Sequence, residues 1–188
     1  RVRDTFPVKS YSVKSLAADY RKFVTKYPGN AKSLEAQRSE AMLYATYLDK
    51  KDQAIALLED LIKNPKVSLQ LKSRVKLDLG DIYLLKGEPW ESTLLYSQVE
   101  KALEENPVGY EAKLKNAKLS YYKGDFKLAQ EHLDILKEAT TREIANDAME
   151  LSIRIKENLV EDTLGEALKA YAKVELLLYQ NKREEALN

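Results

Sequence analysis

The chain has 188 residues, of which 31 are basic and 30 are acidic, so its net charge at pH 7 is close to zero. This balance argues against nucleic acid as the main partner, because nucleic-acid binding usually needs a clearly positive surface. The apolar content of 44% excludes a wholly disordered chain, and the lack of cysteine excludes disulfides, thiolate chemistry and cysteine-ligated metals. No apolar run is long enough to predict a membrane-spanning helix.

Helical periodicity runs through the whole sequence and predicts an all-α fold of about nine helices. We expect helix pairs at about 32–64, 68–105 and 109–139, with further helices at about 9–27, 141–158 and 163–180. The first helix is expected to bury a stripe formed by Leu16, Tyr20, Phe23 and Tyr27. No segment shows sustained alternation of apolar and polar residues, so almost no sheet is expected.

Residues typical of helix N-termini locate the starts of several of these helices more closely. Pro89 suits the first turn of a helix, where its missing N–H does no harm, and that helix is expected to bury Trp90, Leu94, Leu95 and Val99. Asp125 is expected to cap the helix that follows it. Thr140 with Glu143 and Thr163 with Glu166 have the spacing of capping boxes, and they predict the starts of the last two long helices.

Small residues recur at matching positions and indicate an internal repeat. Gly80 lies inside a helical pattern, where glycine costs roughly 1 kcal/mol relative to alanine, which indicates a closely packed neighbouring backbone. Gly80, the turn residue Gly87 and Ser92 are echoed by Ala117, Gly124 and Ala129. The second-helix small positions Ala54, Ser92 and Ala129 are 38 and 37 residues apart. Such a period is typical of stacked helical hairpins.

The repeat resembles the tetratricopeptide unit. The residues that carry this resemblance are Leu79-Gly80-x-x-Tyr83, Gly87, Ser92 and Tyr96 in one copy, and Ala117, Tyr121, Gly124-Asp125-Phe126, Ala129 and Leu133 in the next. The family's first large position instead holds Arg38, Lys76 and Lys113. The resemblance implies a TPR-like α-α superhelix, or solenoid, of antiparallel helix pairs forming a single domain over residues 1–188.

The resemblance also implies a groove on the concave face. The family's concave positions correspond to Tyr47 in the first copy, Arg74, Asp81 and Leu85 in the second, and Lys118, Tyr121 and Tyr122 in the third. Tyr121 also lies on the inward stripe of its helix, so core packing is the better expectation there. A groove rich in tyrosine is suited to gripping a polypeptide, since tyrosine gives a large contact area at low entropic cost.

Signals for catalysis are weak. His132 is the only histidine, no Gly-x-Ser-x-Gly motif occurs, and the six glycines form no phosphate-binding loop. We therefore expect no enzyme activity, no cofactor and no metal. Residues 1–28 hold seven basic and two acidic residues, which indicates either an acidic partner or a solvated surface.

The leading hypothesis is a protein-interaction scaffold that binds a polypeptide partner on its concave face. The alternatives are a structural spacer within a longer protein and a small-ligand or carbohydrate-binding module, for which Trp90 and the tyrosines would provide stacking surfaces. The last alternative is disfavoured because Trp90 is expected to pack between repeats.

Further expectations concern the setting of the chain. The resemblance is to long bacterial chains of this family, and favours the periplasm or cell envelope, with the cytoplasm as the alternative. The start at Arg1 and the helical pattern at the other end predict an internal piece of a longer protein. The apolar run Leu176-Leu177-Leu178-Tyr179 predicts a further helix against it, or self-association through the truncated end.

Overall fold

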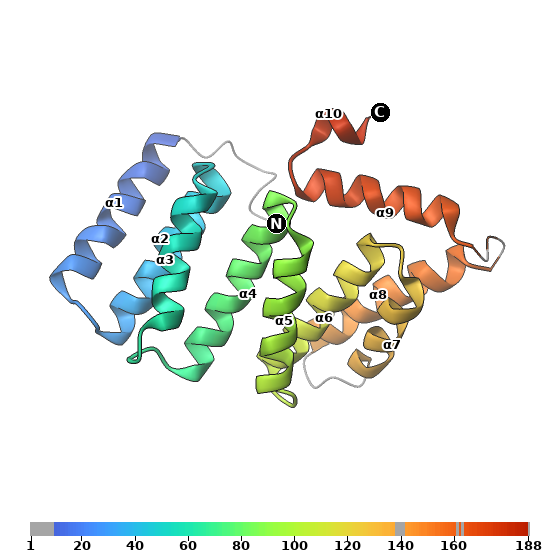
Figure 1. Cartoon of the computed structure of the whole chain (residues 1–188), viewed down its shortest axis with the longest axis horizontal. Helices are drawn as coiled ribbons and strands as arrows, with labels where there is room; N and C mark the ends of the chain where they lie inside the picture. The colour runs from blue at the N-terminus through green and yellow to red at the C-terminus, as the bar shows by residue number, and fades with distance from the viewer. Residues whose placement is uncertain (1–9, 138–141, 161, 163, 188) are drawn as a thin grey trace. The chain divides into compact units, whose positions relative to one another are not determined.

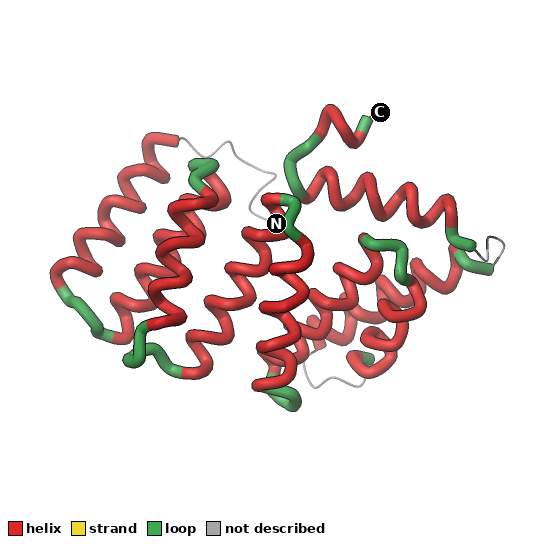
Figure 2. The backbone as a smooth tube through the Cα atoms, in the orientation of Figure 1, coloured by secondary structure: helices red, strands yellow, loops and turns green. Residues whose placement is uncertain are grey.

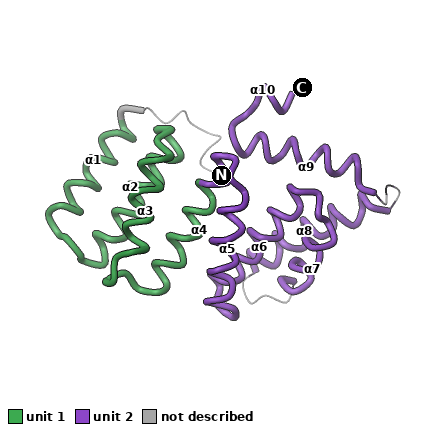
Figure 3. The backbone as a smooth tube through the Cα atoms, in the orientation of Figure 1, with its two compact units in different colours: residues 1–82 green, residues 83–188 purple. Residues whose placement is uncertain are grey.

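The computed structural model describes residues 10–137, 142–160, 162 and 164–187, and every regular element among them is a helix (Figures 1 and 2). The predicted all-α class is confirmed, with ten helices in this part of the chain against the nine expected. The capping residues Thr140 and Thr163 lie outside the described residues. The chain divides into two compact units, residues 1–82 and 83–188 (Figure 3).

Unit 1 contains α1 (Ser10–Lys26), α2 (Ala31–Tyr47), α3 (Lys51–Lys63) and the first part of α4 (Leu69–Lys86). Consecutive helices are joined by short turns, and α2 packs against both α1 and α3 (Figure 1). The turn before α2 uses Gly29 at a φ of 74°, and the side chain of Asn30 then accepts a hydrogen bond from the Lys32 N–H at 2.9 Å. These residues therefore end α1 and begin α2, as the Pro-Gly-Asn sequence predicts.

Unit 2 contains the end of α4 and the helices that follow it. These are α5 (Pro89–Ala102), α6 (Pro107–Tyr122), α7 (Phe126–Leu136), α8 (Arg142–Asn158), α9 (Glu166–Tyr179) and α10 (Arg183–Ala186). From α5 to α8 each helix packs against the next, and α6 also contacts α8. The predicted caps hold: Pro89 is the first residue of α5, and the Asp125 side chain accepts from the Leu128 N–H at 3.2 Å.

The small positions of the repeat are buried as the pattern predicts. Ala54, Ser92 and Ala129 have no exposed surface, and Ala117 is equally buried on α6. A larger side chain at these positions would hold the helices apart, so their size fixes how closely neighbouring hairpins approach. The successive pairing of helices fits the predicted solenoid class.

Two expected apolar stripes are confirmed only in part. In α1 the buried residues are Val13 and Ala17, whereas Leu16, Phe23 and Tyr27 are exposed, because the face that packs on α2 is rotated by one position from the larger side chains. In α5 the expected Val99 is buried, together with Ser92 and Tyr96, and Leu95 is half-buried, whereas Trp90 and Leu94 are exposed.

The direction of the chain changes after α8. Instead of pairing with α8 as a hairpin, α9 packs more extensively against α6, and Leu168 and Ala172 are its buried residues. The side chain of Asp162 accepts hydrogen bonds from the Gly165 and Ala167 N–H groups, which stabilises the start of α9. Leu178 is exposed on α9, so the expectation of a further helix or self-association at this end stays a prediction.

Candidate binding surfaces

The predicted groove residues fall into both units. In unit 1, Tyr47 and Arg74 are exposed and Asp81 is half-buried. In unit 2, Leu85 is half-buried near the end of α4, while Lys118, Tyr121 and Tyr122 lie close together on α6. The structure thus brings together the three residues of the third repeat copy.

These three residues of α6 are already engaged by other helices of unit 2. Tyr121 is only 1% exposed, and its hydroxyl donates to Glu175 of α9 at 2.8 Å. Its ring lies 5.7 Å from that of Tyr122, centre to centre. Lys118 reaches Asp147 of α8 at 3.5 Å. The core position expected for Tyr121 is confirmed, and α9 lies against this face of α6.

The carboxylate of Glu175 organises this contact. It accepts from Arg154 of α8 at 2.9 Å as well as from Tyr121, and Arg154 also pairs with Glu150 at 3.2 Å. Burial, reinforced by the hydrogen bond to Glu175, raises the pKa of the Tyr121 hydroxyl well above its usual range. Tyr121 is therefore a neutral hydrogen-bond donor at physiological pH, and it ties α9 to α6.

The opposite side of α6 is open. A groove of about 950 Å³ lies over α6 between α5 and α7. We call it the α6 groove. Its lining includes Trp90, Glu100, Lys113, Asn116, Lys123 and His132. It lies entirely within unit 2.

Polar side chains form the floor of the α6 groove. Asn116 is 6% exposed, and its Nδ2 donates to Glu100 at 2.9 Å and to Ser97 at 3.4 Å. Lys113 donates to the other oxygen of Glu100 at 2.5 Å. The Oδ1 atom of Asn116 is enclosed and has no hydrogen-bond partner among the described residues. A buried acceptor without a partner costs roughly 1–3 kcal/mol, so this atom is a point where an incoming N–H would be favourable.

The charged groups of the floor are largely committed to one another. Burial raises the pKa of the Glu100 carboxyl, but hydrogen bonds from Lys113 and Asn116 outweigh burial and hold the pKa below its ordinary value. Burial lowers the pKa of His132, a change that the nearby Glu100 charge only partly opposes. Glu100 is therefore ionised and His132 neutral at pH 7. Both groups suit binding better than proton transfer, since Glu100 already accepts two hydrogen bonds.

The rim of the α6 groove carries the only tryptophan of the chain. Trp90 is 79% exposed, and Lys123 lies over its ring at 4.8 Å from the ring centre. Lys123 also contacts the Thr93 hydroxyl at 3.3 Å. The interpretation that Trp90 packs between repeats is thus wrong. The exposure of Trp90 could have been predicted from its position in the first turn of its helix, beside the exposed turn at Gly87.

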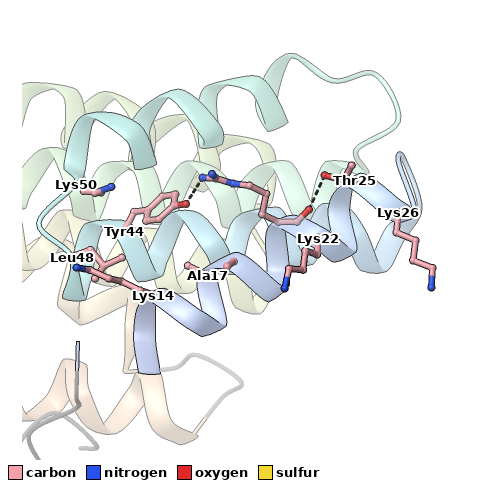
Figure 4. Close-up of a pocket in the computed structure, with 10 residues that line it drawn as sticks. Lys14, Ala17, Lys22, Thr25, Lys26, Tyr44, Leu48 and Lys50 are labelled. Atoms are coloured by element: carbon pink, nitrogen blue, oxygen red, sulfur yellow. Dashed lines mark hydrogen bonds between the residues drawn. The ribbon is translucent and has the colours of Figure 1, made fainter. Parts of the chain in front are cut away.

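Unit 1 has a groove of a different kind between α1 and α2. Its volume is about 650 Å³, and Figure 4 shows the side chains that line it. This α1–α2 groove consists of Lys14, Ala17, Ala18, Arg21, Lys22, Thr25, Lys26, Tyr44, Leu48 and Lys50. The sequence did not predict this groove as a binding site, although the basic excess of residues 1–28 is a signal that indicates it.

Neither a metal site nor a membrane span emerges from the part of the chain that the structure describes. No three histidine or acidic side chains there are grouped so that they could hold a metal ion, and no helix combines the length and apolar character needed to cross a bilayer. Comparison of the chain with family models, curated proteins and solved structures gave no match. The resemblance to tetratricopeptide repeats therefore rests on the motif residues themselves.

Proposed function

We propose that this chain is a protein-interaction module that binds a polypeptide segment in the α6 groove of unit 2. The observation that carries the proposal is the exposed Trp90 at the rim of a groove of about 950 Å³ whose floor contains the unsatisfied oxygen of Asn116. Tryptophan is the side chain that most often anchors protein interfaces, and an exposed one beside a groove is available to a partner.

The chemistry of the floor suits a peptide backbone. The two N–H groups of the Asn116 amide are used by Glu100 and Ser97, which leaves Oδ1 as an acceptor. Rotation about the terminal torsion of Asn116 turns Oδ1 and Nδ2 together, so a backbone N–H that binds this oxygen in the groove would take the place of the hydrogen bonds to Glu100 and Ser97. An extended peptide offers such N–H groups at regular intervals, whereas most small apolar ligands offer none.

The rim adds contacts to side chains. Trp90, Leu128 and Ile135 provide exposed apolar area, while Lys123 and Glu104 provide charges of both signs. A mixed apolar and charged rim around a polar floor is the usual anatomy of a polypeptide interface. The resemblance to tetratricopeptide repeats, a family of binding scaffolds, supports the same function.

The α6 groove lies on a different face of α6 from the concave face that the resemblance implies. Lys118, Tyr121 and Tyr122 lie on the side that meets α8 and α9, where Tyr121 is held by Glu175. A partner on that side would have to displace α9, whereas the α6 groove is open. We therefore place the polypeptide beside Trp90 and Asn116.

The test begins with peptides selected from a random display library on the purified whole chain. Because Trp90 is the only tryptophan, its fluorescence reports binding at the α6 groove directly. We expect selected peptides to shift the emission to shorter wavelength, and Asn116→Ala to weaken their binding about tenfold, or about 1.4 kcal/mol. Circular dichroism of each variant checks that helicity is kept.

The matched control is Leu94→Ala, which removes an exposed apolar side chain from the same helix as Trp90 without touching the lining of the groove. It should leave peptide affinity unchanged, while Trp90→Ala weakens it, as measured by calorimetry. Equal affinity for wild type, Trp90→Ala and Asn116→Ala would place binding elsewhere and refute the α6 groove. Failure to select any peptide would favour the spacer function.

The exposure of Trp90 also favours a second candidate, a carbohydrate-binding module. One side of the indole ring faces Lys123, and the exposed remainder could stack on a sugar ring, a contact that the expected burial of Trp90 would have prevented. Titration with oligosaccharides, followed by calorimetry so that the tryptophan-free variant can also be measured, separates the two candidates. Saturable sugar binding that Trp90→Ala abolishes, with no peptide binding, would decide for this alternative.

A further inference from the structure

The α1–α2 groove of unit 1 concentrates positive charge in a nearly neutral chain. Its lining contains five basic side chains and no carboxylate: Lys14, Arg21, Lys22, Lys26 and Lys50. The whole chain, by contrast, has almost equal numbers of basic and acidic residues. Unless acidic side chains neutralise this local excess of positive charge, the groove is a favourable site for an anionic ligand.

Neutralisation within the chain is incomplete. The carboxylate beneath the groove is Glu40, which is 3% exposed and accepts from Arg21 at 3.0 Å and from the Tyr44 hydroxyl at 2.8 Å. Lys14 and Lys50 form no ion pair with any described residue, and Lys50 instead lies 5.6 Å from the Tyr44 ring centre. Glu40 thus neutralises Arg21, and Asp19 lies 3.6 Å from Lys22, whereas Lys14 and Lys50 keep their charge available.

The floor between these cations is apolar. Ala17 and the ring of Tyr44 are buried, and Ala18 and Leu48 continue the same surface between α1 and α2 (Figure 4). The groove therefore offers a recessed apolar surface with lysine ammonium groups around it. A ligand that satisfies both features carries an aliphatic group together with several negative charges.

Two other anionic partners fit this arrangement less well. Single-stranded nucleic acid needs exposed aromatic rings for base stacking, but Tyr44, the aromatic residue of the groove, is only 7% exposed. A membrane surface needs an apolar face that protrudes beyond the cations, whereas Ala17 and the Tyr44 ring in this groove are buried. A protruding leucine or isoleucine flanked by carboxylates fits the recess directly.

We infer that the α1–α2 groove is a second binding site, which takes an acidic polypeptide segment with an aliphatic side chain inserted against Ala17, Ala18 and Leu48. Lys14 and Lys50 pair with carboxylates on either side of that side chain. This site lies in unit 1 and is independent of the function proposed for the α6 groove in unit 2. Its specificity is for net negative charge, in contrast to the mixed charges around the α6 groove.

The test uses a fluorescently labelled peptide of alternating glutamate and leucine, with binding to the whole chain followed by fluorescence anisotropy. We expect saturable binding that weakens with added salt and is at least about tenfold weaker for Lys14→Glu/Lys50→Glu. The matched control Lys63→Glu/Lys66→Glu makes the same change of charge on exposed residues outside the groove. Equal losses in both double variants would mean non-specific charge attraction and would overturn the site.

The apolar part of the site is tested separately. Ala18→Gln fills the groove without changing charge, and Ser15→Gln is its matched control at an exposed position of α1 outside the lining. We expect the first to weaken binding about tenfold and the second to leave it unchanged. A peptide of alternating glutamate and serine should bind weakly, and equal binding of the two peptides would refute the apolar recess.

Two further probes decide the class of partner. Vesicles containing phosphatidylserine and a single-stranded oligonucleotide present negative charge without a peptide backbone. Binding of either one, lost in Lys14→Glu/Lys50→Glu, combined with no binding of the glutamate–leucine peptide, would assign the groove to that partner and overturn the peptide proposal. Because these variants leave Trp90 and Asn116 intact, their outcome is separate from that of the α6 groove.

Discussion

The two grooves differ in how their charged side chains are neutralised. In the α6 groove of unit 2, Glu100 accepts from both Lys113 and Asn116, so acid and base are paired within the floor. In the α1–α2 groove of unit 1, one buried carboxylate lies beneath five basic side chains. The first groove is therefore suited to backbone hydrogen bonding and aromatic contact, and the second to long-range attraction of an anion.

This contrast supports the proposal that one repeated architecture carries two different binding surfaces. Both grooves lie over neighbouring helices of one unit, with the buried Ala17 and Tyr44 in the floor in unit 1 and the buried Asn116 in the floor in unit 2. The helices supply the geometry, and side chains outside the repeat pattern supply the chemistry. Variants that remove one groove and leave the other intact test the comparison directly.

The largest expected effect is on unit 2. A Cβ atom at Gly109 would overlap the backbone carbonyl oxygen of Leu103, which cannot move without disturbing the turn between α5 and α6. We expect Gly109→Ala to lower the free energy of unfolding by about 2–3 kcal/mol, because a backbone atom obstructs the added methyl group. Chemical denaturation followed by Trp90 fluorescence measures this loss within unit 2.

The control for Gly109→Ala is Glu111→Ala on the exposed side of α6, which should change stability by no more than about 0.5 kcal/mol. Binding of the glutamate–leucine peptide to unit 1 should survive Gly109→Ala at temperatures where unit 2 begins to unfold. Parallel loss of both properties would contradict the independence of the two grooves.

A second variant affects unit 1 in two opposite directions. Glu40→Gln removes the buried charge that Arg21 and Tyr44 contact, and we expect a loss of stability of about 1–2 kcal/mol. The same change leaves Arg21 without its carboxylate, so affinity for the glutamate–leucine peptide should increase. Thermal denaturation and anisotropy titration measure the two effects, and weaker peptide binding in a folded Glu40→Gln variant would argue against charge as the basis of recognition.

The sequence predicted the helices well because their signals are local. Helix starts such as Pro89 and the cap at Asp125 depend on residues close together in the chain, and the small positions Ala54, Ser92 and Ala129 depend on a regular period. The helix pairing of the repeat follows from the same pattern.

The candidate surfaces were harder to predict because they depend on which face of each helix is covered. The repeat pattern correctly predicts that Ser92, Tyr96 and Val99 of α5 are buried, but the size and apolar character of Trp90 predict burial for a residue that lies at a groove rim. The position of α9 against α6 depends on contacts such as Tyr121 with Glu175, which are separated by 54 residues. No local pattern encodes such a contact, and for this reason the sequence does not predict that α9 lies against the Tyr121 face of α6.

The contact between α9 and α6 distinguishes the two sides of α6, one covered and one open, and its hydrogen bond gives the smallest expected effect. Tyr121→Phe removes the donor to Glu175 and keeps the ring, so we expect a loss of about 1 kcal/mol near neutral pH. Hydrogen exchange should show faster opening of α9, while α5 and α7 beside the open groove stay protected. Unchanged exchange in α9 would mean that packing of Leu168 and Ala172 holds it without Tyr121.

The pH dependence of stability separates this hydrogen bond from packing. Because burial and Glu175 raise the pKa of Tyr121 in the folded chain, its contribution is present below the unfolded value of 10.0 and is lost as the pH rises above it. The unfolded chain releases the phenolic proton first, so alkaline pH favours unfolding. Phenylalanine does not titrate, and the decline of unfolding free energy above pH 10 should therefore be shallower in Tyr121→Phe than in wild type. Identical slopes would show that the Tyr121 hydroxyl does not couple α9 to α6, and the covered side of α6 would then depend on apolar packing alone.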